Sequence, residues 1–327
     1  MRKLFFIVLC FAGGLSLWAQ GGSTTFDYLL LPHSARSAAL GGVNVSVIEN
    51  DASLIYDNPA FLGGEMDKTL VVSYLAYIAD IGMGNVTFTK QLGEKTSFGI
   101  GALFGNYGSM VEATNDNQIL GDLRATDICG SIFVAHDLTE RLRGGVTGKF
   151  LYSNYYHNTA IGIGVDLGVS YCNEEHTFSW GLVGKNIGRQ IKAYEEDLAK
   201  LPWDIQFGAS LKLTNAPIRF SVTAMHLKRW KFDDIYSGGD TFIKTLGKHF
   251  LAGVEVMPSD NFWMGIGYNI KRAADMHLET GNRLGGFSAG VGLRIKTFSV
   301  GCSLGKYNTA ATSFMISIAT SFAPREI

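Results

Sequence analysis

Apolar residues recur at every second position from about residue 69 to the end of the chain. The segment 160–174 shows the pattern clearly, because its apolar residues share one parity and small or polar residues hold the other. The apolar set is Ile161, Ile163, Val165, Leu167, Val169 and Tyr171, and the intervening set is Gly162, Gly164, Asp166, Gly168 and Ser170. Successive side chains of a β-strand point to opposite faces, so the pattern predicts strands with one apolar and one small or polar face.

About fourteen such segments follow one another along the chain. Each is close to the ~10 residues that a tilted strand needs to cross a bilayer. The predicted spans are 69–80, 84–92, 96–106, 124–137, 142–155, 160–174, 177–187, 203–213, 217–227, 248–257, 261–271, 285–295, 298–307 and 312–322. We therefore predict an all-β fold, a transmembrane antiparallel β-barrel of about 14 strands in the bacterial outer membrane, with outer-membrane lipid against its apolar face.

The links between these segments sort by parity. Links after even-numbered segments have two or three residues, for example 93–95 and 296–297. The long links all follow odd-numbered segments and are 107–123, 188–202, 228–247 and 272–284. Outer-membrane barrels have short periplasmic turns and longer external loops. A soluble β-sandwich gives no reason for such sorting, so the asymmetry favours a membrane barrel.

The first residues are typical of a secretory signal peptide. Arg2 and Lys3 precede the apolar run 4–11, and we expect cleavage near Ala19 or Gln20, which assigns residues 1–20 to the signal. The alternative is a transmembrane anchor. It is weaker, because glycine and serine interrupt the run and about 20 apolar residues are needed to span a bilayer.

Residues 21–68 precede the first barrel segment and do not alternate as the barrel (69–327) does. The small residues of 34–42 predict a short helix that ends at glycine. Three valines at alternate positions in 43–47 predict one short strand. The motif Asn58, Pro59 and Ala60 predicts a turn, since proline restricts the residue before it. Many inward positions of the barrel are glycine or serine, so we expect 21–68 to form a plug (hatch) in the lumen.

Composition narrows the function further. Removal of the signal leaves 26 basic and 29 acidic residues, which gives no basic footprint for nucleic acid. Neither the cysteines nor the histidines show metal-ligand spacing, and no cofactor is expected. A few charged residues share the inward parity, and we expect a solvated or hydrogen-bonded lumen there rather than a conduction path. These are Lys149, Asp166, Lys212, Glu255 and Arg294.

Two short matches to acyl-enzyme motifs are chance matches by their context. Ser303 and Lys306 fit S-x-x-K, and 259–261 reads Ser-Asp-Asn. The chemistry needs the serine and lysine one helical turn apart. Here they fall in an alternating strand, where positions three apart point to opposite faces. No nucleophile and base pair emerges, so we do not expect an enzyme.

Aromatic residues gather near the ends of the predicted strands. They are Tyr107, Tyr155, Tyr156, Trp180, Trp203, Tyr268 and Tyr307. Interfacial rings anchor barrels at the level of the lipid headgroups, which is the interpretation that we favour. The alternative is a platform for sugar binding.

Longer runs resemble known families. LPHSARSAALGG from Leu31 and NDASLIYDNPAFL from Asn50 resemble the N-terminal hatch of FadL-like barrels, which have fourteen strands. Over essentially the whole mature chain the sequence resembles the PorQ family, outer-membrane proteins of the Bacteroidetes type IX secretion system, related to PorV. The runs that carry this resemblance include TFDYL (25–29), VDLGVSY (165–171), LVGKNIG (182–188), RFSVTAMHLKRW (219–230), HFLAGVEVMPSDNFWMGIGYN (249–269) and GGFSAGVGLRI (285–295).

The PorQ resemblance implies a non-enzymatic protein that holds a PorZ-like surface protein at the outer membrane, with other components of the attachment complex as further possible partners. We expect the partner to contact the long external loops. Interface hot spots favour aromatic residues, so the candidate contact residues are Tyr194, Trp230, Phe232 and Tyr236. The alternative on the same fold is a FadL-type passive transporter of hydrophobic solutes. It predicts an apolar pocket that reaches a lateral opening where a strand kinks inward.

Overall fold

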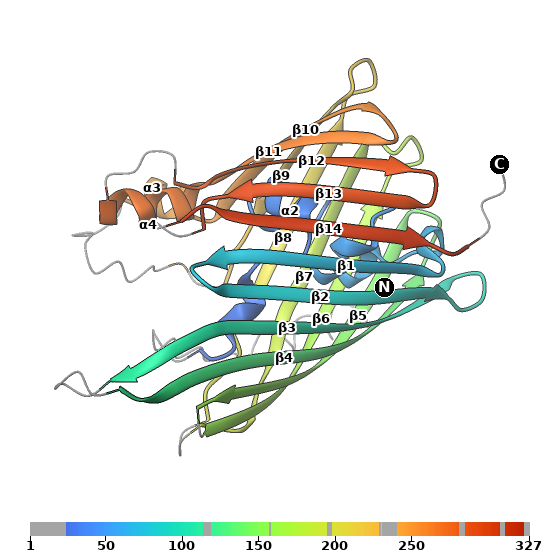
Figure 1. Ribbon diagram of the computed structural model, residues 1–327. Coiled ribbons are helices and arrows are strands. Elements are labelled where there is room, and N and C mark those ends of the chain that lie inside the picture. The colour runs from blue at the N-terminus through green and yellow to red at the C-terminus, as the bar shows by residue number, and fades with distance from the viewer. Residues whose placement is uncertain are drawn as a thin grey trace, which may run out of the picture.

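The described strands close into one antiparallel barrel, in which each strand pairs with its neighbours along the chain and β1 pairs with β14 (Figure 1). The computed structural model describes residues 24–113, 119–156, 158–194, 198–228, 230, 241–280, 285–307 and 311–323. The predicted signal peptide, 1–20, lies outside these residues. The predicted fold class, a closed antiparallel barrel of 14 strands, is confirmed.

Most strand bounds fall within a few residues of the predicted spans. The strands are β1 Thr69–Ile78, β2 Ile81–Gln91, β3 Thr96–Ala113, β4 Ile119–Asp137, β5 Leu142–Tyr155, β6 Asn158–Cys172, β7 Phe178–Lys192, β8 Asp204–Lys212, β9 Ile218–Ala224, β10 Phe250–Ser259, β11 Phe262–Asn269, β12 Phe287–Ile295, β13 Phe298–Gly305 and β14 Ser313–Ser321. We call the end with the short turns, after β2, β4 and the other even-numbered strands, the inner end. The end with the long links is the outer end.

The outer end differs most from the prediction. Most of 107–123, predicted as a loop, belongs to β3 and β4, which continue as a paired ribbon past a register shift between Asn106 and Ser109. A ribbon beyond the membrane needs backbone pairing but no apolar face, so alternation could not reveal it. Strand β7 also runs past the predicted end at 187, and β9 stops short of 227.

Two helices lie within predicted external loops. Helix α3, Phe242–Gly247, lies in 228–247, and α4, Ile270–Thr280, starts directly after β11 and fills most of 272–284. Both project beyond the strand ends on the left of Figure 1. The predicted strand 261–271 was therefore two residues too long at its end, because α4 begins at Ile270.

The outer surface of the barrel is an apolar belt. Along β6 the residues Ile163, Val165 and Leu167 are exposed, while Gly164 and Asp166 between them are buried. The same order holds on β8, where Ile205 and Phe207 point outward. Large exposed apolar side chains in such a closed band mark a surface made for lipid. Within the described residues no helix is long and apolar enough to cross a membrane.

The described residues 24–68, which we call the plug, fold against the inner face of the wall. They contain α2 Ala35–Ala39 and four 3₁₀ helices, η1 Asp27–Leu30, η2 Ala52–Tyr56, η3 Pro59–Phe61 and η4 Gly64–Met66. Leu40, Leu54 and Phe61 are at most 1% exposed. Full burial of such a side chain contributes roughly 1.5–3 kcal/mol, so the plug supplies apolar contacts that a barrel with a small-residue lumen lacks.

The N-terminal prediction of a helix and a strand needs correction at the strand. Helix α2 begins after Ser34, whose Oγ accepts a hydrogen bond from the Arg36 amide, and the chain turns at Gly41 with a positive φ of 104°. No strand forms at 43–47. The Asn44 side chain accepts hydrogen bonds from the amides of Ser46 and Val47 instead. Such a local bond offers the backbone an alternative to strand pairing.

Candidate functional site

Small wall side chains hold the plug by hydrogen bonds to its backbone. The Ser288 hydroxyl accepts from the Gly41 amide at 3.0 Å and donates to the Ala39 carbonyl at 2.8 Å. On the opposite side, Ser179 donates to the Ser46 carbonyl at 2.7 Å. Each such bond contributes about 1 kcal/mol net. The serines at inward positions therefore satisfy plug backbone that would otherwise be buried without partners.

The Asn58, Pro59 and Ala60 turn sits against the wall of β5 to β7. The Asn58 Oδ1 accepts from the Ala60 amide at 3.0 Å, and its Nδ2 donates to the Val169 carbonyl at 3.3 Å. The turn fits because Gly145 faces it: a Cβ there would lie 2.4 Å from the Ala60 nitrogen. Real Cβ atoms do not come that close. The wall glycine thus allows the turn to touch the strand backbone.

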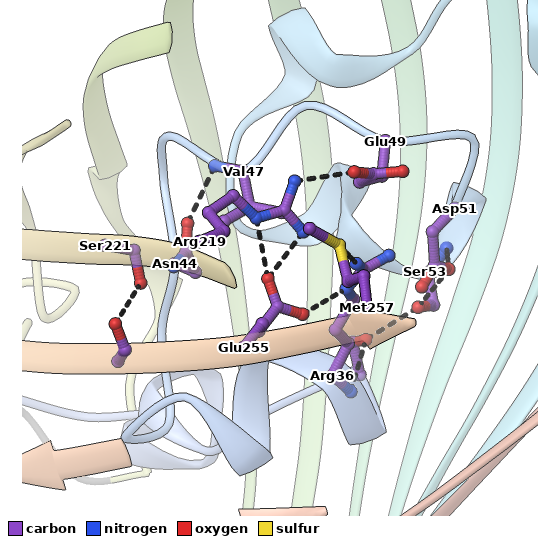
Figure 2. A network of polar contacts seen from close by, with 12 residues as sticks. Arg36, Asn44, Val47, Glu49, Asp51, Ser53, Arg219, Ser221, Glu255 and Met257 are labelled. Atoms are coloured by element: carbon purple, nitrogen blue, oxygen red, sulfur yellow. Dashed lines mark hydrogen bonds and ion pairs between the residues drawn. The ribbon is translucent and has the colours of Figure 1, made fainter. Parts of the chain in front are cut away.

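An ion-pair network joins the plug to β9 and β10 near the inner end (Figure 2). Arg36 of α2 donates from Nε to Glu255 Oε1 at 2.7 Å. Arg219 reaches Glu255 Oε2 at 2.8 Å from Nε and Glu49 Oε1 at 2.6 Å from Nη1. Glu255 of the wall therefore pairs with both arginines. Arg219 of the wall pairs in addition with Glu49 of the plug.

This network is buried, and its charges depend on one another. Glu255 is 1% exposed. Burial alone would raise the pKa of Glu49, but the guanidinium groups of Arg36 and Arg219 outweigh it and lower that pKa to about 2. A buried pair contributes little relative to apolar residues, yet removing one partner costs about 3–5 kcal/mol because a charge is left unpaired. The network therefore fixes the plug in one position.

A second polar cluster lies where β7 bulges. Opposite Asp166, strand β7 carries two residues instead of one, Lys185 and Asn186, and both are buried. The Lys149 Nζ donates to the Asn186 Oδ1 and pairs with Asp166, each at 2.7 Å. The Lys185 Nζ lies 3.9 Å from Oδ1 of the plug residue Asp57. Burial raises the pKa of Asp57 to about 6, although the charge of Lys185 acts to lower that pKa. The bulge turns an extra charged residue into the lumen.

The inner cavity has a volume of about 570 Å³ and opens among the short turns. Charged side chains of both signs line it, including Arg36, Glu49, Arg143 and Arg219. Arg143 pairs with Asp137 at 2.5 Å on the wall and with Glu65 at 3.2 Å on the plug. The charges that line this cavity are largely committed to one another, so it serves as the braced underside of the plug.

The outer cavity has a volume of about 420 Å³ and lies above the first residues of the plug. Its walls are the outer ends of β3 to β6 and the start of the β7–β8 link. It is lined by Phe26, Asp27, Tyr28, Tyr107, Asp127, Ser153, Tyr155, Asn158 and Tyr194. Aromatic rings thus form most of a pocket that has the size of a small ligand site.

Hydrogen bonds orient the tyrosines of the outer cavity. The Tyr107 hydroxyl donates to Asp127 Oδ2, and the Tyr194 hydroxyl donates to Ser153 Oγ. Ser153 in turn bonds the Asp127 side chain. Two rings from distant segments are therefore tied to one carboxylate on β4. A ligand entering this pocket meets rings that are already held in place, which lowers the ordering cost of binding.

Of the four residues expected to contact a partner, the structure describes Tyr194 and Trp230. Tyr194 lines the outer cavity, and burial raises the pKa of its hydroxyl. Trp230 is exposed and packs 4.8 Å, centroid to centroid, from the His249 ring. Phe232 and Tyr236 lie outside the described residues.

Three of the seven aromatics expected at the membrane interface turn inward instead. Tyr107 and Tyr155 line the outer cavity. Tyr307 packs against the plug and donates from its hydroxyl to the Ala38 carbonyl at 3.2 Å. By contrast, Trp180 stacks with Tyr171 on the outer face of the barrel.

The charged positions predicted for the lumen fall into two groups. Lys149, Asp166 and Glu255 are buried ion-pair members. Lys212 and Arg294 line the inner cavity, and Arg294 also donates to the Asn50 carbonyl at 2.5 Å. The ion pairs and the hydrogen bond at four of these five positions agree with the expected solvated or hydrogen-bonded lumen.

Sequence reasoning missed their partners and the acid of the outer cavity. Arg219 and Asp127 were not singled out, although both share the parity of buried neighbours on their strands. Arg36 sits on a helix, where strand parity says nothing. Asp127 on β4 and Arg219 on β9 could have been found by continuing the alternation of inward and outward positions along their strands.

The two acyl-enzyme matches stay apart in the fold. The carbonyl of Asn261, at the inner end, accepts from the Arg294 amide. Ser303 lies five residues along β13 from its start at Phe298, which is about 16 Å at strand rise.

The described residues hold no group of three His, Cys, Asp or Glu side chains that could bind a metal ion.

No family model and no curated protein matches the chain. Solved outer-membrane barrels do. The toluene transporter TbuX of Ralstonia pickettii is 13% identical with a TM-score of 0.54 over 90% of this chain and 100% of that chain. The toluene transporter TodX of Pseudomonas putida is 12% identical with a TM-score of 0.54 over 89% and 97%. A FadL homologue of Pseudomonas aeruginosa is 11% identical with a TM-score of 0.53 over 90% and 98%.

The closed barrel, its apolar belt and these comparisons define the class. The chain is an integral outer-membrane β-barrel with an N-terminal segment inside. Its fold is that of the FadL-like barrels, to which it is similar over about nine-tenths of its length. Two of the barrels that it resembles, TbuX and TodX, are described as toluene transporters.

Proposed function

We propose that the protein is a FadL-type passive channel that takes up small ring-containing solutes through the outer cavity. The observation that carries the proposal is this pocket of about 420 Å³, in which rings from the plug, the wall and an external link converge. Burial of a solute ring against aromatic side chains is favourable on both area and geometry. Two barrels of similar fold are described as toluene transporters, which supports the class of solute.

Passage beyond this pocket requires the plug to move. Phe26 and Tyr28 form part of the cavity lining, and both are buried. Below them the plug is held against the wall as far as the ion pairs of Arg36 and Arg219. The plug in this position therefore corresponds to the closed state of the proposed channel.

The seam between β7 and β8 offers the proposed exit. Strand β8 pairs with β7 only as far as Asp204 opposite Lys185, directly before the bulge at Asn186. Beyond it, β7 contacts the link through bonds such as that from the Gln190 amide to the Ala199 carbonyl at 3.3 Å. A wall segment held by a link opens at less cost than a full strand ladder.

An apolar groove of about 680 Å³ lies over the outer face of β4 to β8 and extends to this seam. Leu182, Gly184, Ile187, Trp203 and Ile205 are among the residues that line it. A solute that leaves the lumen at the bulge would enter this groove and then lipid. The alternative stated from the sequence predicts an apolar pocket that reaches a lateral opening where a strand kinks inward. The bulge on β7 and the adjoining groove support placing such an opening at this seam.

Entry of radiolabelled 4-ethylphenol into outer-membrane vesicles tests this function. Vesicles that contain the barrel should fill faster than vesicles without it. Tyr194→Ala, which removes a ring of the outer cavity, should slow entry several-fold. Tyr152→Ala is the matched control, because Tyr152 lies on β5 beside Ser153 but faces outward. Equal rates with and without the barrel would contradict the channel.

A second function, the PorQ-type anchor for a PorZ-like surface protein, is favoured by one observation. Helix α3 carries Phe242 and Ile243, which are 69% and 75% exposed, at the outer end beyond the strands. Exposed apolar residues outside the lipid belt mark a protein-binding surface. Helix α3 also lies in 228–247, one of the long external loops that the sequence analysis expects to contact the partner.

Retention of the surface protein on cells tests the anchor. Phe242→Ser combined with Ile243→Ser should release the partner into the medium while solute entry stays normal. Lys271→Ser on α4 is a control at the same end of the barrel. Unchanged retention in the double variant, with the barrel folded, would exclude this surface as the anchor.

A further inference from the structure

The outer cavity combines aromatic rings with negative charge. Asp127 lies in its wall and Asp27 at its rim. Among the described residues that line the cavity there is no lysine or arginine. The inner cavity differs in this respect, since Arg36, Arg143, Lys212, Arg219 and Arg294 all line it. The outer cavity, which suits a ring compound, is therefore acidic in its described lining.

The Asp127 carboxylate is held as an acceptor. Tyr107 and Ser153 both donate hydrogen bonds to it. Among the described residues of the cavity lining there is no cation beside it. Asp27 at the start of η1 adds a second, exposed carboxylate. A negatively charged solute would have to lose water beside these groups without gaining a counter-charge.

A positively charged or donor-bearing solute meets the opposite situation. An ammonium group is attracted both by carboxylates and by the faces of tyrosine and phenylalanine rings. Hydroxyl donors of a ring compound find acceptors in the carboxylates and in the Asn158 side-chain amide. The cavity thus offers acceptors and rings and lacks the groups that bind a carboxylate.

On this basis we infer that the outer cavity selects ring compounds that are cationic or neutral with hydrogen-bond donors, such as aromatic amines and phenols, and rejects carboxylates. The inference rests on the proposed channel function and names its substrate class. Fatty acids and aromatic acids fall in the rejected class. Simple hydrocarbons fit the rings but leave the acceptors of Asp127 and Asn158 without a partner from the solute.

Three probes that share one phenol ring test the rule on the purified full-length barrel in detergent micelles. They are tyramine, 4-ethylphenol and 3-(4-hydroxyphenyl)propionate, which differ in side-chain charge at neutral pH. Calorimetric titration, with empty micelles as the blank, should give at least tenfold tighter binding for tyramine than for the propionate, about 1.4 kcal/mol. The neutral phenol should lie between them. Higher salt should narrow the ratio, because exposed charges are screened.

Carboxylate-to-amide variants assign the selectivity. In the variant Asp27→Asn combined with Asp127→Asn, the ratio of the affinities for tyramine and the propionate should fall below about threefold. The variant removes the two carboxylates whose charge is expected to produce the tenfold ratio, about 1.4 kcal/mol. Asparagine keeps an acceptor for Tyr107, so the cavity geometry is preserved. Asp80→Asn is the matched control, since Asp80 is an exposed acid at the same end that does not line the cavity.

The outcomes separate the two levels of the proposal. Equal binding of tyramine and the propionate to the wild-type barrel, or a ratio unchanged in the double variant, overturns the charge rule alone. The channel proposal survives that result if Tyr194→Ala still weakens all three probes. If none of the three binds, the channel proposal fails, and the charge rule fails with it.

Discussion

The two halves of the barrel interior are built differently. At the inner end, Arg36 and Glu49 of the plug are locked to Arg219 and Glu255 of the wall by buried ion pairs. At the outer end, aromatic rings surround an open pocket, and two of them are held by hydroxyl hydrogen bonds, Tyr107 to Asp127 and Tyr194 to Ser153. Its described lining residues include no cation. Both ends sit inside the same strand ladder.

This difference indicates a division of labour. Paired buried charges penalise displacement, because separating them leaves each without a partner. Aromatic rings around a cavity tolerate an empty and a filled state, since their own hydrogen bonds persist in both. Under the proposed function, the inner half fixes the plug and the outer half receives the solute.

Loss of the shared carboxylate should have the largest effect on this arrangement. Glu255→Gln leaves Arg36 and Arg219 without their common counter-charge, so we expect about 3–5 kcal/mol lower stability. The midpoint of urea unfolding in micelles, followed by tryptophan fluorescence, measures it. Glu94→Gln, an exposed acid in the β2–β3 turn, is the control. A Glu255→Gln barrel as stable as this control would remove the basis for a braced inner half.

Replacement of a wall glycine beside the plug should cause the second-largest loss of stability. Gly145→Ala places a Cβ 2.4 Å from the Ala60 nitrogen, so plug or strand must shift, at a cost of about 1–3 kcal/mol. Gly148→Ala on the same strand is the matched control, because nothing lies within 4 Å of its Cβ position. The same urea titration applies. Similar losses in both variants would show that strand propensity, and not plug contact, determines the result.

Acid should loosen the inner half through Glu49. The pKa of Glu49 is lowered from 4.5 to about 2 in the folded state. Its contribution is therefore complete above about pH 4.5 and is lost as the pH falls toward 2. The stability difference between wild type and Glu49→Gln should shrink over that window. The contribution of Asp57 is the same in both proteins and cancels in this difference. The pKa of Asp57 is raised from 3.8 to about 6, so its effect on stability between these pH values has the opposite sign. A difference that is constant with pH would contradict the pairing.

The smallest expected effect is at the outer cavity. Tyr194→Phe keeps the ring but removes the hydroxyl that bonds Ser153. The net value of such a bond is about 0.5–1.5 kcal/mol, so affinity for 4-ethylphenol should fall a few-fold and plug stability should not change. Tyr152→Phe, on the outward face of β5, is the control. An unchanged affinity would show that the ring position does not depend on this bond.

The barrel itself followed from period-two alternation, because lipid outside and a filled lumen inside constrain every second residue. The same rule, continued past the predicted span 96–106, places Tyr107 inside with Leu103 and Gly105. We assigned that tyrosine to the lipid interface because aromatic residues near strand ends are common there. Composition at the strand ends was a weaker guide than parity.

Other features were beyond any periodic signal. The partners Arg36 and Glu255 are separated by 219 residues, and one of them lies on a helix. Only the closed fold brings them together. The Asn44 turn that replaces the predicted strand depends on one side-chain acceptor, which competes with pairing at that site. External helices such as α4 follow strands without a break and carry no alternation.

The central claim is that the plug, fixed at the inner end, must move for solute to pass, while the outer cavity binds solute without that movement. The Ser46 and Ser210 hydroxyls lie 2.7 Å apart, across the seam between plug and β8. Ser46→Cys with Ser210→Cys places two sulfurs within reach of a disulfide. The double variant is made in a chain whose native cysteines Cys129, Cys172 and Cys302 are alanine.

Entry of 4-ethylphenol into outer-membrane vesicles that contain this variant is the most direct test. Oxidised vesicles should fill no faster than vesicles without the barrel, a reductant should restore entry, and binding to the outer cavity should be the same in both states. A crosslink within the plug, Ser34→Cys with Ser53→Cys, joins hydroxyl positions 2.6 Å apart and should leave entry unchanged. Equal entry in oxidised and reduced vesicles of the plug-to-wall variant would contradict the account.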